Sequence, residues 1–145
     1  MRVRVTMTSL EQDMDLLRKF ENLELEADSF GHREHLRVAW TMLQKWSPHE
    51  AMDRYIVALR RFAEHHGAAE RYHETITLFY LYEIQQRIAQ RPPAASWHEF
   101  AAANPELANS HREFLGRHYP AEVLASAFAR KHFVPPQHIS AKDVR

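Results

Sequence analysis

The sequence contains no cysteine and only three glycines among its 145 residues. Without cysteine there is no disulfide, thiolate metal site, iron–sulfur cluster or cysteine nucleophile. The few glycines leave little material for phosphate-cradling loops or hairpin turns. An excess of charge is also missing, because 19 Lys and Arg residues balance 19 Asp and Glu residues. This balance argues against a dedicated nucleic-acid-binding protein and against a polybasic protein of the membrane surface.

Long apolar runs are absent as well. No stretch of about 18 apolar residues occurs, so we expect no membrane-spanning helix. The first residues, Met1–Val5, lack the apolar region of a signal peptide. We therefore expect a cytoplasmic protein. A chain of this length forms one domain and buries roughly 70% of the surface of the unfolded chain, so it needs no staple to fold.

Helix-favouring residues dominate what is present. Ala, Leu, Glu, Arg and Gln are abundant, which together with the scarcity of glycine indicates an all-α fold. We predict a single-domain bundle of about six helices over 1–145, with flexible ends at 1–8 and 137–145. The predicted helices cover about 10–23, 32–46, a stretch from 48 to just before Gly67, 72–91, a stretch that starts at 97, and a last helical region over 111–133 that is either continuous or broken before Pro120.

Two of these helices begin with a capping box, in which a serine is followed three residues later by a glutamate. The boxes are Ser47–Glu50 and Ser96–Glu99. His49 and His98 lie inside them and are expected to face water.

Histidine is unusually frequent, with 11 residues. In the predicted helix over 32–46, His32 and His35 share a face with the apolar residues Leu36, Ala39, Leu43 and Trp46. Their spacing brings both rings within reach of one ion, and such a pair can bind Zn, Fe, Cu or Ni. Arg33 and Arg37 flank the pair, where they either attract an anionic substrate or pair with Glu34 or Asp28.

A third inward histidine is expected at the start of the predicted helix over 72–91. His73 shares a face there with Ile76, Thr77, Tyr80, Ile84 and Ile88. Glu74 flanks this face and could bind a metal, orient a ligand or act as a base. If the two helix starts meet, three imidazoles and a carboxylate converge in the bundle core. The predicted metal ligands are therefore His32, His35 and His73, and the predicted catalytic residue is Glu74.

An ordinary structural role competes with this interpretation, since buried histidines are often simply hydrogen-bonded. Three unpartnered imidazoles would each cost about 1–3 kcal/mol, which favours a shared metal or catalytic site over mutual hydrogen bonding. His66 is a weaker candidate for an extra ligand. We interpret Trp40, Tyr72 and Tyr80 as aromatic core rather than pocket. The remaining histidines are interpreted as exposed: His65, His111, His118, His132 and His138.

The two histidine segments resemble a family of small, mostly bacterial proteins of uncharacterised function. The segments are Phe-Gly-His-Arg-Glu-His-Leu-Arg-Val-Ala-Trp at 30–40 and Tyr-His-Glu-Thr-Ile-Thr at 72–77. The resemblance covers most of the chain from Leu17 onward and places His32, His35, His73 and Glu74 at the motif positions. The ending Val134–Gln137 departs from the Pro-Asp ending of the relatives. The family supplies no activity, so the resemblance strengthens the site and leaves the reaction open.

Three functions are compatible with these residues. The first is a mononuclear metal-dependent enzyme acting on a small molecule, with a non-haem Fe or Cu oxidoreductase slightly preferred over a Zn hydrolase. The alternative is a non-catalytic module that binds a metal or a small ligand. The third is metal-free acid–base chemistry by His73 and Glu74, which is disfavoured because adjacent helical side chains point about 100° apart. The sequence leaves the metal, among Fe, Cu and Zn, undetermined.

Overall fold

The computed structural model describes residues 7–109 and 111–137. This part of the chain is all-α, as predicted, and contains no strand. Its helices are α1 (Ser9–Glu21), α2 (His32–Lys45), α3 (Pro48–His65), α4 (Glu74–Gln90), α5 (Trp97–Ala103), α6 (Pro105–Ala108), α7 (His111–Gly116), α8 (Ala121–Leu124) and α9 (Ala127–Lys131). Two 3₁₀ turns, Ala27–Ser29 and Ala69–Arg71, precede α2 and α4. Of the predicted flexible ends, only residues 7, 8 and 137 lie inside the described ranges.

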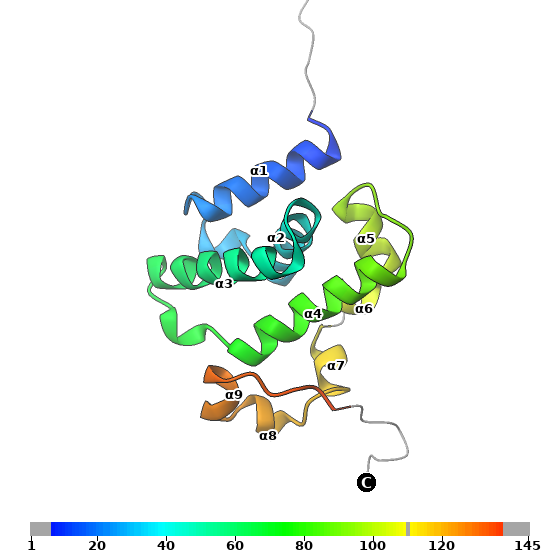
Figure 1. The fold of residues 1–145 in the computed structure, drawn as a ribbon. Coiled ribbons are helices and arrows are strands. Elements are labelled where there is room, and N and C mark those ends of the chain that lie inside the picture. Colours follow the sequence, from blue (N-terminus) through cyan, green and yellow to red (C-terminus); the bar gives the residue numbers. More distant parts are fainter. Residues whose placement is uncertain (1–6, 110, 138–145) are drawn as a thin grey trace, which may run out of the picture.

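Helix α2 is the centre of the fold. It lies between α1 and α4 in Figure 1 and also contacts α3, α5 and α6. Because neighbours surround it, its burial is not confined to the stripe that the sequence predicts. Val38, Trp40, Thr41 and Met42 are buried along with Leu36 and Ala39. Trp40 is therefore core, as expected.

The local signals predicted for the starts of α3 and α5 and for the end of α3 are confirmed. Ser47 and Ser96 cap α3 and α5 by accepting hydrogen bonds from the backbone N–H groups of Glu50 and Glu99, at 3.4 and 3.3 Å. Gly67 follows α3 with a φ of +68°, a left-handed conformation that suits glycine. In the described ranges no helix is both long and apolar enough to cross a lipid bilayer.

Two helix boundaries differ from the prediction in ways that matter. The region predicted over 111–133 is three short helices: it is broken at Pro120, one of the two expected alternatives, and Ser126 starts a further helix that is not expected. Helix α4 begins at Glu74 rather than Tyr72, and His73 is its N-cap. His73 therefore does not start the buried stripe of a helix. Its side chain instead caps the N-terminus of α4 by accepting a hydrogen bond from the Ile76 N–H.

The buried start of α4 also holds the C-terminal helices. The Thr75 hydroxyl is shared between the carbonyl oxygens of Ala129 and His132, at 2.6 and 2.8 Å, and accepts from the Val134 N–H at 3.1 Å. Thr75 is fully buried, and α9 packs beside α4 (Figure 1). One side chain thus satisfies backbone groups of a segment more than fifty residues away.

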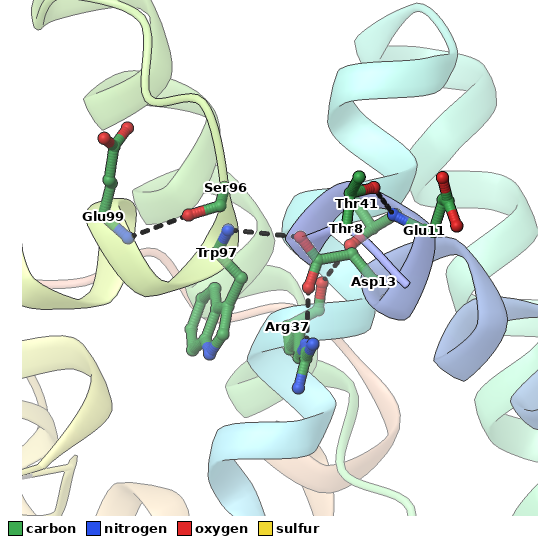
Figure 2. A network of polar contacts seen from close by, with 8 residues as sticks. All are labelled: Thr8, Glu11, Asp13, Arg37, Thr41, Ser96, Trp97 and Glu99. Atoms are coloured by element: carbon green, nitrogen blue, oxygen red, sulfur yellow. Dashed lines mark hydrogen bonds and ion pairs between the residues drawn. The ribbon is translucent and has the colours of Figure 1, made fainter. Parts of the chain in front are cut away.

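A buried carboxylate joins α1, α2 and α5 (Figure 2). Asp13 is fully buried; its Oδ1 accepts from Arg37 Nε at 2.6 Å, and its Oδ2 accepts from the Trp97 N–H at 3.2 Å. Trp97 is the first residue of α5, so the carboxylate also meets the positive end of that helix. Arg37 pairs with Asp13 rather than with the Glu34 or Asp28 that the sequence suggests.

The Asp13 pair should be far more important for stability than an ion pair at the surface. Replacing Asp13→Asn leaves the Arg37 charge largely buried without its counter-ion, and we expect a loss of roughly 3 kcal/mol in the free energy of unfolding. The matched control is Glu21→Gln, which breaks the more exposed pair with Arg54 and should cost about 0–1 kcal/mol. Urea denaturation measures both, and equal losses would contradict the role given to Asp13.

Candidate ligand-binding cavity between α2, α3 and α4

Two adjoining hollows lie among α2, α3 and α4. The outer chamber has a volume of about 350 Å³ and the inner chamber about 80 Å³. Both are lined by His35, Leu59, Ile76 and Thr77, so they border on one another. The remaining lining is mostly apolar or aromatic: Phe30, Phe62, Ala63 and Tyr72 in the outer chamber, and Leu36, Ala39, Tyr55 and Tyr80 in the inner one.

Larger grooves exist elsewhere on the molecule. One of about 730 Å³ runs along α1, and one of about 520 Å³ lies beside the turn that precedes α4. Neither is lined by a histidine. The chambers are therefore the hollows that the three predicted metal ligands line.

His32 stands on the first turn of α2 and lines the inner chamber. Its Nε2 donates to the carbonyl oxygen of Leu107 at 2.9 Å, since a carbonyl can only accept. Its ring stacks on His111, with centroids 4.2 Å apart, and meets the edge of Tyr80 at 5.0 Å. Burial is the main cause that lowers the pKa of His32, and the neighbouring His111 lowers it further.

His35 lies one turn further along α2 and is the histidine that both chambers share. Its ring lies 4.3 Å from that of Phe30. Burial lowers the pKa of His35 to about 4, helped by His32 and opposed by a hydrogen bond to the Phe30 backbone. The imidazole is therefore neutral at physiological pH.

His73 lines the outer chamber, but both of its ring nitrogens are engaged. Nδ1 accepts from the Ile76 N–H at 3.2 Å, and Nε2 donates to the Leu124 carbonyl oxygen at 2.8 Å. These two bonds fix a neutral tautomer and use its only ring lone pair. In this arrangement His73 caps α4 and anchors α8.

Glu74 lines neither chamber. Its Oε1 accepts from the Tyr72 hydroxyl at 2.5 Å, and the Arg60 guanidinium lies over the Tyr72 ring, 4.7 Å from its centroid. Burial chiefly raises the pKa of Tyr72, and the Glu74 carboxylate raises it further. Tyr72 is thus a wall residue of the outer chamber, rather than purely a core residue as the sequence suggests.

The three predicted metal ligands are divided between the two chambers: His32 lines the inner one, His73 the outer one, and His35 both. Across 7–109 and 111–137, no group of three or more His, Cys, Asp or Glu side chains is placed to hold a metal ion. The set of His32, His35 and His73 with Glu74 as catalytic residue therefore stays a prediction. His49 and His98 are exposed, as expected.

Sequence reasoning missed His111 and the aromatic walls. His111 is expected at the surface because an arginine follows it, yet it packs on His32 from a helix almost eighty residues away. Phe30 stacks on Phe20 at a centroid distance of 4.7 Å, Phe62 is tilted against Phe20 at 5.5 Å, and both Phe30 and Phe62 line the outer chamber. Apolar spacing marks Phe62 as buried, but no local signal tells whether a buried ring borders a cavity.

The low pKa of His35 predicts a pH-dependent stability. Between about pH 6.5 and pH 4 the unfolded chain takes up a proton on His35 that the folded chain does not. Stability should therefore fall as the pH drops through this window, by roughly 2–3 kcal/mol from this residue, and His35→Gln should remove that part of the loss. Urea denaturation between pH 7.5 and pH 4 measures it, with the exposed His49→Gln as control. An NMR titration that puts the pKa of His35 near 6.5 would contradict the prediction.

No protein-family model matches the chain, and neither a curated protein nor a solved structure is significantly similar to it. The resemblance based on the two histidine segments therefore stays a prediction. What the site does has to be inferred from its own chemistry.

Proposed function

We propose that this protein binds a small organic molecule in the two chambers, with His35 as the polar group that receives it. The volume of the outer chamber and its mixture of apolar walls with a few inward polar groups are typical of small-molecule sites. This is the ligand-binding alternative that the sequence leaves open.

The hydrogen-bonding state of His35 is the main support for this proposal. A neutral imidazole has one N–H donor and one acceptor nitrogen. The hydrogen bond to the Phe30 backbone raises the pKa, so a carbonyl oxygen there accepts the ring N–H. Among the described residues none donates to the other nitrogen. An acceptor kept neutral by burial, in the wall of both chambers, suits a ligand that brings a hydroxyl or amide donor into an apolar pocket.

The proposal predicts that filling the outer chamber blocks binding. Ala63 lines this chamber from α3, and Ala63→Leu occupies part of the space a ligand needs. We expect the Kd for phenol and indole, measured by NMR titration, to rise at least tenfold. Val57→Leu, on the exposed side of the same helix, should change it less than twofold. Phenol should also bind more tightly than toluene, which has no hydroxyl for His35.

The outcomes of this titration are distinct. Shift changes centred on His35, Phe62 and Thr77 support the site. Equal affinities in both variants, or shift changes confined to the α1 groove, contradict it.

A second candidate is a divalent transition-metal site that includes His32 and His35, in line with the metal-dependent enzyme that the sequence favours. Two observations support it: the pair line the inner chamber one helical turn apart, and burial lowers the pKa of both. The neutral imidazole is the form that binds a metal. His32 keeps Nδ1 as its acceptor nitrogen, because Nε2 donates to Leu107. The ion supplies Lewis-acid or redox chemistry when bound, with Fe, Cu and Zn as the candidates.

The metal candidate predicts a selective loss of affinity. His32→Ala and His35→Ala should each weaken Co²⁺ or Zn²⁺ binding at least tenfold, because even the loss of a residue that only hydrogen-bonds a metal ligand has an effect of about this size. His49→Ala should leave the affinity unchanged, since His49 is exposed. His73→Ala tests whether His73 is a third ligand beside His32 and His35. It should weaken metal binding only if His73 gives up its hydrogen bonds to Ile76 and Leu124 and binds the ion. Isothermal titration with chelator-treated protein measures all four variants. Equal losses in every variant would indicate a diffuse surface site.

A further inference from the structure

The described residues that line the two chambers include a positively charged side chain but no negatively charged one. Across the described residues that border them, Arg71 is the one permanently charged side chain, and there is no aspartate or glutamate. Glu70 and Glu74, on either side of Arg71 in the sequence, line neither chamber, and Glu74 accepts a hydrogen bond from the Tyr72 hydroxyl. A cationic ligand would therefore find no counter-ion here, whereas an anionic ligand would find one.

Arg71 is placed to meet such a ligand. It is exposed and belongs to the outer chamber, so it stands at the rim rather than in the wall. No hydrogen bond or ion pair joins its guanidinium to another described residue, in contrast to Arg130, which donates to the Glu70 carbonyl oxygen at 3.0 Å. A guanidinium without a partner can form a bidentate bond with a carboxylate.

The outer chamber is also unusually rich in flat rings. Phe30 and Phe62 lie 5.1 Å apart, and the imidazoles of His35 and His66 pack against them at 4.3 and 4.5 Å. His66 is tied back, since its Nε2 donates to the Leu25 carbonyl oxygen at 3.1 Å. Aromatic rings favour an aromatic guest through offset or edge contacts.

From these features we infer that the ligand is an aromatic carboxylic acid. Its ring lies against Phe30 and Phe62, and its carboxylate pairs with Arg71 at the rim. This inference rests on the proposed function, because it names the class of molecule that the same chambers take. It adds a specificity residue, Arg71, that sequence analysis did not single out.

The test compares three probes of similar shape and different charge: phenylacetate, phenylacetamide and phenethylamine. At pH 7.5 and low salt, phenylacetate should bind at least tenfold more tightly than the other two. Arg71→Gln should raise the Kd of phenylacetate to that of the amide and leave the amide unchanged. Arg61→Gln is the matched control, since Arg61 is exposed on α3 and lines neither chamber. Added NaCl should weaken the acid more than the amide, because salt screens an exposed pair.

Other results separate this inference from the proposed function. If acid and amide bind equally, or the amine binds best, the ligand class is wrong while the binding site stands. The same holds if phenol and indole bind in the chambers and none of the three probes does. If no probe of either set binds there, the proposed function itself fails. A loss of acid binding in Arg61→Gln as large as in Arg71→Gln would assign the preference to the overall surface charge.

Discussion

The carboxylate of Asp13 lies where α1, α2 and the start of α5 meet, and the orientation of α2 depends on it. Arg37 reaches this carboxylate from α2. Arg37 and His35 are two residues apart, which turns them about 200° from one another around the helix axis. Fixing Arg37 against α1 and α5 therefore directs His35 to the opposite side, toward α3 and α4. The buried ion pair and the cavity therefore lie on opposite sides of α2.

The motif around His73 divides into a structural part and a lining part. The side chains of His73 and Thr75 donate hydrogen bonds to backbone carbonyl oxygens of the C-terminal segment, at Leu124, Ala129 and His132. Ile76 and Thr77, directly after them, line the chambers. The short segment 73–77 thus holds α8 and α9 in place and forms one wall of the candidate site. Its unusual sequence does not by itself imply that every residue in it touches a ligand.

The sequence is a good guide wherever the signal is local. The caps at Ser47 and Ser96 and the turn at Gly67 lie where the residue types indicate, and the inward face of His32 and His35 follows from helical spacing. The start of α4 is displaced because histidine is not among the usual N-cap residues, so nothing in the sequence marks His73 as the cap. Asp13 and His111 depend on partners far along the chain, Arg37 and His32, which no local pattern identifies. Helical periodicity finds the candidate face but not the partners across it.

The two bonds of the His73 ring connect the candidate site to the C-terminal segment. The Nδ1 lone pair can serve either the Ile76 N–H or a guest in the outer chamber, and the Nε2 proton can serve either Leu124 or that guest. A guest that accepts the Nε2 proton must therefore compete with the docking of α8, whereas a guest that donates to Nδ1 competes with the cap of α4. Thermodynamic linkage makes that competition reciprocal, so loosening the C-terminal segment would favour the guest by the same factor by which the guest loosens the segment. The Leu124 carbonyl oxygen would thus be an internal competitor of the guest for the Nε2 proton of His73.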